Sequence, residues 1–199
     1  DGCSVTRDTV FFQGNYFLPH GIVVNADDVS LDCNGSVLDG EHNFQNGITI
    51  FRRAGVTIKN CNVANYERAG LFARESDFAR IENNLFSGSE WNYGVHIYHS
   101  SGNILKDNSM SGNRVGLYVE GLEKRDYEHF IDETNRVNSN PVVYLFDVKD
   151  LVIKDLDLGR LEINFGENIS IANNNVESDG VLLNNVANSF ISSNRISES

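Results

Sequence analysis

The chain has 199 residues and a formal net charge of −12, and 40% of its residues are hydrophobic. This charge disfavours nucleic acid, anionic membrane surfaces and polyanionic glycans as partners. No stretch approaches the roughly 20 consecutive apolar residues of a membrane span. The composition therefore indicates an acidic globular protein with enough apolar residues for a hydrophobic core.

Residues 1–20 come before any repeat and are rich in apolar and aromatic side chains. They contain Val10-Phe11-Phe12 and Tyr16-Phe17-Leu18. We expect this segment to form an N-terminal cap that covers the open end of the core.

From residue 21 onward, a glycine followed by a short apolar strand recurs along the chain. The intervals between the first five glycines are 26, 23, 24 and 22 residues, and a second apolar beat such as Val56-Thr57-Ile58 follows in phase. This self-similarity, with alternating faces and no helical period, predicts an all-β solenoid whose unit is one coil of a parallel β-helix. The six glycine segments are Gly21–Val24, Gly47–Ile50, Gly70–Ala73, Gly94–Ile97, Gly116–Val119 and Gly180–Leu183.

Residues 121–140 are charged and polar and interrupt the pattern. Leu105 and Ile153 are 48 residues apart, which is two coils of 24 residues. We therefore expect an irregular coil with a loop insertion, anchored inward by Ile131 and Val137, rather than a linker. The prediction is one β-helix domain over residues 1–199 with about seven or eight coils. Because the pattern is still running at the last residues, we expect it to be a fragment of a longer repeat protein.

Asparagines cluster just after the second apolar beat of each coil. Asparagine tolerates the left-handed conformation of a tight corner, and its amide can bond to the next coil. We expect Asn60, Asn83 and Asn173 at equivalent corners, with a structural role rather than a binding role.

The three cysteines leave two alternatives open. In one, a disulfide ties Cys3 in the cap to Cys33, and one thiol is left over; in the other, all three cysteines, including Cys61, are reduced and buried. No Cys/His spacing suggests a zinc site.

Two stretches resemble the NosD-like right-handed β-helix proteins, also called the periplasmic copper-binding family. Residues 21–35 read GIVVNADDVSLDCNG and are similar to the opening coil of that family, G-I-x-I-x-A-x-x-V-T-L-D-x-N-G. Residues 131–144 are similar to its motif I-D-x-S-N-x-V-N-G-K-P-V-Y-Y, with Ser139-Asn140 in place of Gly-Lys. The resemblance implies right-handed coils and an extracytoplasmic location, secreted, periplasmic or at the cell surface.

The copper in the family's name would need a cluster of imidazole or soft ligands. The candidates are His20, His42, His96, His99, His129 and Met110. Only His96 and His99 are near each other, and on a strand they point to opposite faces. We expect no metal site and no cofactor.

Strand alternation predicts an aromatic surface on the outward side of the first strand of successive coils. If Val95 and Ile97 and their counterparts point inward, their neighbours point outward. Coils stack at roughly 4.8 Å, so these neighbours form one contiguous patch. Exposed aromatic patches of this kind are typical of interaction sites and suit sugars. The predicted binding residues are Phe51, Phe72, Arg74, His96, Tyr98, Tyr118 and Glu120, with Trp91 in the preceding loop.

Several functions are compatible with this patch. The first is a non-catalytic module of a surface or secreted protein that binds a glycan or a neighbouring surface protein, with end-to-end or lateral self-association as a structural variant. The second is a carbohydrate-active enzyme, a polysaccharide lyase, epimerase or hydrolase, although Glu120 is the only carboxylate on the patch and no catalytic residue can be assigned. The third is a periplasmic metal-maturation accessory. A further alternative is that the 121–140 insertion or another subunit covers the rings.

Overall fold

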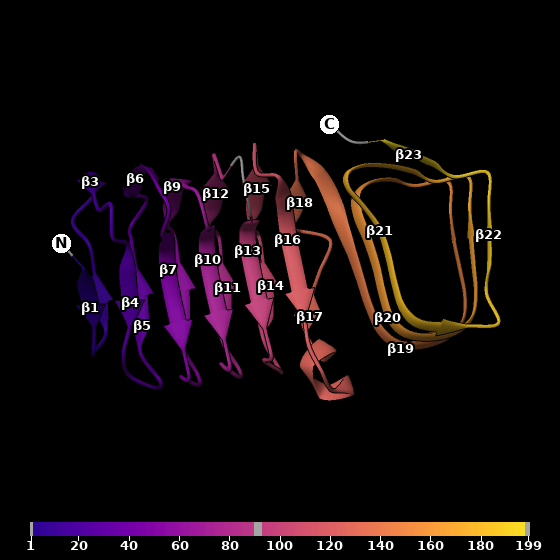
Figure 1. Cartoon of the computed structure of the whole chain (residues 1–199), viewed down its shortest axis with the longest axis horizontal. Coiled ribbons are helices and arrows are strands. Elements are labelled where there is room, and N and C mark those ends of the chain that lie inside the picture. The colour runs from indigo at the N-terminus through magenta and orange to yellow at the C-terminus, as the bar shows by residue number, and fades with distance from the viewer. Residues whose placement is uncertain (1, 90–92, 198–199) are drawn as a thin grey trace.

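The computed structural model describes residues 2–89 and 93–197 and shows a nearly all-β solenoid (Figure 1). Up to β18 (Arg136–Val137), each coil contributes a strand to each of three sheets. The first sheet contains β1 (Cys3–Val5), β4 (Ile22–Val24), β7 (Asn46–Phe51), β10 (Ala69–Arg74), β13 (Tyr93–Tyr98) and β16 (Val115–Glu120). The second contains β2 (Thr9–Val10), β5 (Ser30–Asp32), β8 (Thr57–Lys59), β11 (Arg80–Glu82), β14 (Ile104–Lys106) and β17 (Phe130–Ile131).

The third sheet continues beyond the other two. It begins with β3 (Asn15–Phe17), β6 (Val37–Asn43), β9 (Asn62–Tyr66), β12 (Leu85–Ser87), β15 (Ser109–Ser111) and β18 (Arg136–Val137). It then adds β19 (Asn140–Lys154), β20 (Asp157–Ala172), β21 (Asn175–Ala187), β22 (Phe190–Ser192) and β23 (Arg195–Ser197). The described residues form about nine turns, slightly more than the seven or eight predicted. The parallel β-helix predicted from the repeat is confirmed.

The solenoid has two segments with separate cores. We call residues 2–137 the first segment and residues 140–197 the second segment. Strands of the first segment lie side by side along the length of the molecule, whereas the coils of the second segment are seen face-on as closed loops (Figure 1). The change occurs at β19, which pairs antiparallel with β18 through Arg136–Pro141 and Val137–Asn140, while the described pairs elsewhere are parallel. Val142 and Tyr144 of β19 pack into the first core, and Val143 packs into the second.

A buried polar network lies at the seam between the segments. Arg160 pairs with Glu162 at 2.7 Å and approaches Asp179 at 3.7 Å, and the three side chains are at most 4% exposed. The Asp179 carboxylate accepts hydrogen bonds from the Gly116 N–H at 2.8 Å and the Leu117 N–H at 2.9 Å. These amides belong to β16, the last strand of the first sheet. Asp179 therefore satisfies the edge of the first sheet that the turn of the solenoid would otherwise leave unpaired.

Within the 121–140 stretch, the structure shows a short 3₁₀ helix, η1 (Lys124–Tyr127), followed by β17 and β18. Ile131 and Val137 are buried in the first core, as predicted. The insertion is therefore the last coil of the first segment, with η1 as its protruding turn.

Asparagine forms the corners of the solenoid. Asn60, Asn83 and Asn173 have left-handed φ values of 57°, 55° and 56°, each directly after a strand, which confirms the predicted corners. A second, buried set forms a ladder along the axis: the Asn84 amide donates to Asn108 at 3.0 Å, and the Asn108 amide donates to Asn135 at 2.9 Å.

One disulfide forms and one thiol is left over, as in the first alternative, but the bridge joins Cys33 to Cys61, so the Cys3–Cys33 pairing and the alternative of three reduced cysteines are wrong. Cys3 pairs with Ile22 in the first sheet, whereas Cys33 follows a strand of the second sheet. Cys33 and Cys61 instead follow adjacent strands at the same corner, with their Cα atoms 4.8 Å apart, within the usual range for a disulfide. Cys3 is a free, exposed thiol.

Candidate functional site

The pairing register of the first sheet places the predicted binding residues in two adjacent outward columns. Phe72, His96 and Tyr118 are partners in successive strands. The second column contains Phe51, Arg74, Tyr98 and Glu120. All seven predicted residues therefore lie on one face of one sheet, which we call the aromatic face.

Contacts between rings organise the middle of the aromatic face. The His96 ring lies 5.0 Å from the Phe72 ring and 5.2 Å from the Tyr118 ring. Tyr93 contacts His96 at 4.6 Å and stacks on Tyr118 at 4.9 Å, with an angle of 8° between the planes. Tyr93 was not predicted, because simple alternation gives it the inward parity of Val95. Its ring nevertheless lies among the outward rings of His96 and Tyr118.

Arg74 connects the rings at the other side of the face. Its guanidinium carbon lies 5.4 Å from the centre of the Phe51 ring and 5.5 Å from that of Tyr98, and its Nε is 3.1 Å from Glu75. A cation over a ring face is attracted to the ring. Phe51 and Tyr98 lie on β7 and β13, the two strands next to Arg74 on β10, so its guanidinium lies between the two rings.

A pocket of about 460 Å³ opens beside His96. His96 and Phe72 form one side of the pocket. The other lining residues come one to three positions before the glycine of a coil, and strand alternation does not predict which way their side chains point. Its lining residues are Phe44, Asn46, Arg68, Phe72, Tyr93 and His96. Phe44, Asn46 and Arg68 lie one to three residues before Gly47 or Gly70, and this position relative to the repeat glycine is the sequence feature that could have identified them.

His96 is the electrostatic centre of the site. Burial, together with the smaller effect of the nearby positive charge of Arg68, lowers its pKa to about 4. Its Nε2 lies 3.6 Å from a carboxylate oxygen of Glu120, and its side chain is 15% exposed. Burial also raises the pKa of Tyr118, and Glu120 adds to that effect. At neutral pH the face therefore presents a neutral imidazole and a neutral phenol beside one carboxylate.

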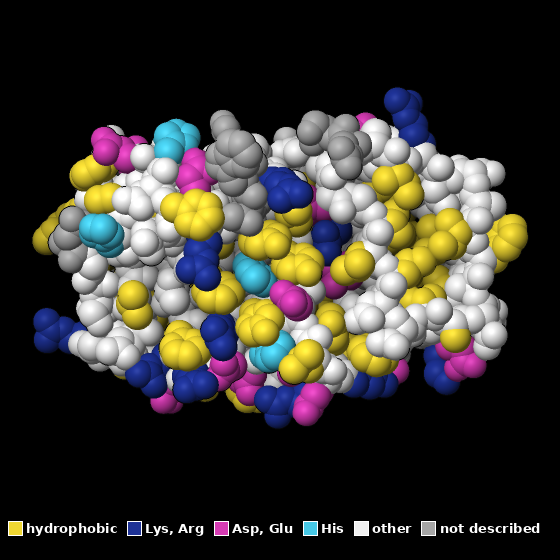
Figure 2. Space-filling view, viewed as in Figure 1, with side chains coloured by type: hydrophobic (Ala, Val, Ile, Leu, Met, Phe, Trp, Pro, Cys, Tyr) yellow, Lys and Arg dark blue, Asp and Glu magenta, His cyan; other side chains and the backbone are white. Residues whose placement is uncertain are grey.

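The aromatic face is partly open to solvent: Phe72, Tyr98 and Tyr118 are half-buried, and its second column also contains more exposed side chains. Phe51 is 41% exposed, and the side chain of Glu120 is 45% exposed. Figure 2 shows hydrophobic and histidine side chains gathered at the centre of this view, among separate basic and acidic ones. The 121–140 insertion contributes no residue to the pocket lining. Trp91, predicted beside the patch, lies outside the described residues.

The described residues contain no group of three or more His, Cys, Asp or Glu side chains arranged to hold a metal ion. They also contain no helix with the length and apolar character needed to cross a bilayer. His96 lies in β13 and His99 directly follows this strand, but the His99 ring stacks on Tyr98 at 3.9 Å instead of joining His96.

Comparison with known proteins places the fold in a family. A family model described as a right handed beta helix region matches residues 20–155. The chain belongs to the right-handed beta helix family. The match begins at the first repeat and ends just after β19, so it covers the coils of the first segment that carry the aromatic face. No curated protein and no solved structure matches the chain.

Proposed function

We propose that the chain is an extracytoplasmic β-helix module that binds a glycan through the aromatic face, as part of a surface or secreted protein of the NosD-like kind. The observation that carries the proposal is the combination of register-aligned, partly exposed rings with a pocket of about 460 Å³ beside them. Flat rings stack on the apolar faces of sugars, while phenol, imidazole and amide groups bond to hydroxyls.

The disulfide supports the location. Disulfides persist in oxidising compartments and are rare where thiols are kept reduced. Cys33 and Cys61 are both fully buried at a corner of the solenoid, so the bridge is structural. Thiol labelling of protein isolated from its native source, with and without reductant, tests this part: labelling at Cys3 alone before reduction is the expected result.

The ligand should be neutral or weakly charged, because the chain's net charge of −12 repels a polyanion at low salt. A glycan array probed with intact protein identifies the ligand, and titration calorimetry measures its affinity. Each stacked ring contributes about 0.5–1.5 kcal/mol beyond its buried area. Tyr98→Ala should therefore weaken binding about tenfold, equivalent to about 1.4 kcal/mol.

Phe130→Ala is the matched control, because Phe130 is a 55% exposed ring on the second sheet, away from the aromatic face. It should leave affinity unchanged. Unchanged affinity in a Tyr98→Ala, Tyr118→Ala double variant would place the site elsewhere. A cooperative loss of stability in that variant would instead show that another protein or segment covers the rings.

A catalytic role on the same face has one observation in its favour, the 3.6 Å approach of His96 to Glu120. A general base works best when its pKa lies near the working pH, and burial holds the pKa of His96 at about 4. Binding without turnover therefore fits the face better. Turnover assays on the glycans that bind would separate the two, with Glu120→Gln expected to abolish activity only if the face is catalytic.

A further inference from the structure

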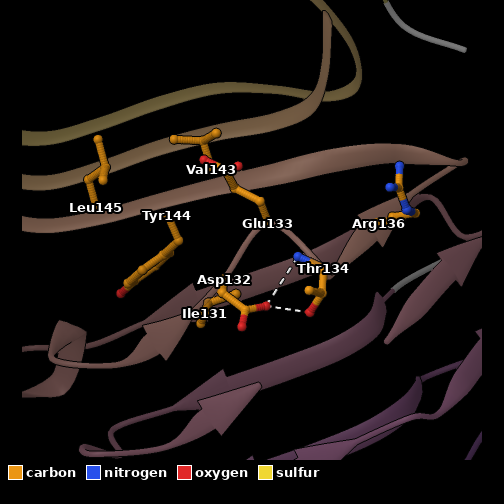
Figure 3. A pocket seen from close by; sticks show the side chains of 8 residues that line it. All are labelled: Ile131, Asp132, Glu133, Thr134, Arg136, Val143, Tyr144 and Leu145. Atoms are coloured by element: carbon orange, nitrogen blue, oxygen red, sulfur yellow. Dashed lines mark hydrogen bonds between the residues drawn. The ribbon is translucent and has the colours of Figure 1, made fainter. Parts of the chain in front are cut away.

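A second surface, unrelated to the aromatic face, lies where the first segment meets the second. It is a pocket of about 520 Å³ between the loop after β17 and the strand β19 (Figure 3). Its lining residues are Ile131, Asp132, Glu133, Thr134, Arg136, Val143, Tyr144 and Leu145. Its floor is apolar and buried, since Ile131, Val143 and Tyr144 are 5%, 8% and 7% exposed. Its rim is the exposed, polar loop.

The main chain of β19 is unpaired beside this pocket. Along one side β19 pairs with β20 from Val142 to Lys154. Along the other side its ladder with β18 includes only Asn140 and Pro141. The Val142 N–H donates to the Asn135 carbonyl at 2.9 Å, away from β20. Because main-chain groups alternate in direction along a strand, the N–H and C=O of Tyr144 also point away from β20, toward the pocket.

The second sheet ends at the same place. Its last strand, β17, pairs with β14 and with no further strand among the described residues. The Phe130 N–H donates to the Asn103 carbonyl, on the β14 side. By the same alternation, the main-chain groups of Ile131 point to the open side. Two strand edges of different sheets therefore border one pocket, and such edges are templates for an added strand.

The acidic side chains of the loop after β17 favour an added strand that carries basic residues. Asp132 is held in place, accepting hydrogen bonds from the N–H and hydroxyl of Thr134. Glu133 has no hydrogen-bond or ion-pair partner among the described residues, and it lines the same pocket as Val143 (Figure 3). Arg136, at the far end of the loop, donates to the Ser139 carbonyl at 2.9 Å. An unpaired carboxylate above an apolar floor fits a long basic side chain, whose stem packs while its charge pairs.

We propose that this pocket docks an extended peptide segment of a partner protein, which adds a strand at β19 and places a lysine or arginine against Glu133. Main-chain hydrogen bonds to the edge give affinity, and the apolar floor with the Glu133 carboxylate selects alternating apolar and basic residues. The proposal is independent of glycan binding, because none of these residues belongs to the aromatic face.

The test uses a fluorescein-labelled peptide of alternating valine and lysine, about ten residues long, which is the usual upper length of a strand. Fluorescence anisotropy measures its binding to the full chain. Glu133→Lys should weaken binding on the order of tenfold, the effect of about 1.4 kcal/mol. Glu128→Lys is the matched control: Glu128 is exposed on the same insertion but does not line the pocket, and its variant should change affinity less than about twofold, as expected for a screened surface charge.

Two further measurements separate strand addition from non-specific attraction to an acidic protein. A peptide N-methylated at every second residue keeps its charge but loses donors along one edge, and it should bind much more weakly. Hydrogen exchange should slow at the Tyr144 and Ile131 amides when the unmodified peptide is added. Equal affinity of the N-methylated peptide, equal effects of the two lysine variants, or protection confined to another surface would overturn the proposal. Sedimentation showing a dimer that the peptide cannot dissociate would also overturn it, since a second copy of the chain would then occupy the edge.

Discussion

The two segments of the solenoid are built from the same repeat but bury it to different degrees. In the first segment, core residues such as Leu71, Ile81 and Leu105 are completely buried. In the second segment, Leu161 and Ile163 are equally buried, but Val181 and Leu183 one coil later are only partly so. Each coil of a solenoid is covered by its neighbours, so burial depends on the coil's position as well as on its sequence.

Ionisable and polar groups differ between the segments as well. All five histidines precede residue 130, whereas the buried Arg160–Glu162 pair belongs to the second segment and faces the first. Apolar packing and an asparagine ladder stabilise the first segment. Buried ion pairs among Arg160, Glu162 and Asp179 stabilise its junction with the second segment. The following predictions test that contrast, from the largest expected effect to the smallest.

Removing one member of the buried Arg160–Glu162 pair should give the largest loss of folding stability. Glu162→Ala leaves the buried Arg160 guanidinium without its main partner, which typically costs about 3–5 kcal/mol. Urea unfolding should show this loss together with a separate, earlier transition for the second segment. The double variant Arg160→Met, Glu162→Leu removes both charges and should recover most of the stability. A loss below about 1 kcal/mol for Glu162→Ala would show that water reaches the seam.

Truncating one leucine in each core should give the next largest effect on stability, and the two losses should differ. Leu105→Ala removes a completely buried side chain and should cost about 3 kcal/mol, within the usual range for core leucines. Leu183→Ala removes a partly exposed one and should cost about 1 kcal/mol, because less apolar area returns to water. Chemical denaturation of both variants measures the two losses in the free energy of unfolding. Equal losses would indicate that another chain or segment covers the last coil in solution.

The sequence predicts much of the first segment and little of the seam. The glycine period and strand alternation identify the inward Val95 and Ile97 and the outward His96 and Tyr98, because both patterns are local properties of a strand. The change of direction at β19 depends on how two finished coils pack, which no local pattern encodes. In the sequence, Arg160, Glu162 and Asn164 alternate with apolar residues, a pattern typical of a strand with one face in solvent. In the structure all three polar side chains are buried.

The candidate site follows the same rule. The register of adjacent coils brings the two predicted columns together, so residues within strands could be assigned in advance. Phe44 and Arg68 lie in corner segments and Asn46 is the first residue of β7, where side-chain direction depends on the adjoining backbone turn rather than on parity. The disulfide shows the same limit: Cys33 and Cys61 meet at a corner, where counting from the preceding strand gives different positions.

Breaking the asparagine ladders should cost less than truncating the first core. Asn108→Ala leaves the Ile81 carbonyl and the Asn84 amide without partners in a buried column, at about 1–3 kcal/mol. Asn174→Ala removes the equivalent bonds in the second segment, to the Ile153 carbonyl and to Asn194. Its effect should be smaller, since water can replace bonds near the partly exposed Asn194. Thermal unfolding of the two variants provides the comparison, and a larger effect at Asn174 would contradict it.

Mild acid should weaken the first segment selectively. Burial lowers the pKa of both His96 and His129 from 6.5 to about 4, so between these values the unfolded chain binds more protons than the folded chain. Stability therefore falls as the pH drops from 6.5 toward 4, by about 1–2 kcal/mol per histidine between pH 7 and pH 5. Asp179 acts in the opposite sense: burial raises its pKa, so its protonated form is favoured in the folded chain and acid does not weaken the seam through this group. Hydrogen exchange at pH 7 and pH 5, corrected for the slower intrinsic exchange at pH 5, should show lower protection factors around His96 and His129 at the lower pH, with those of β20 little changed. A His129→Gln variant, which cannot be protonated, should lose part of the pH dependence. Lower protection factors in β20 and unchanged ones near the histidines would reverse the assignment of the acid-sensitive region.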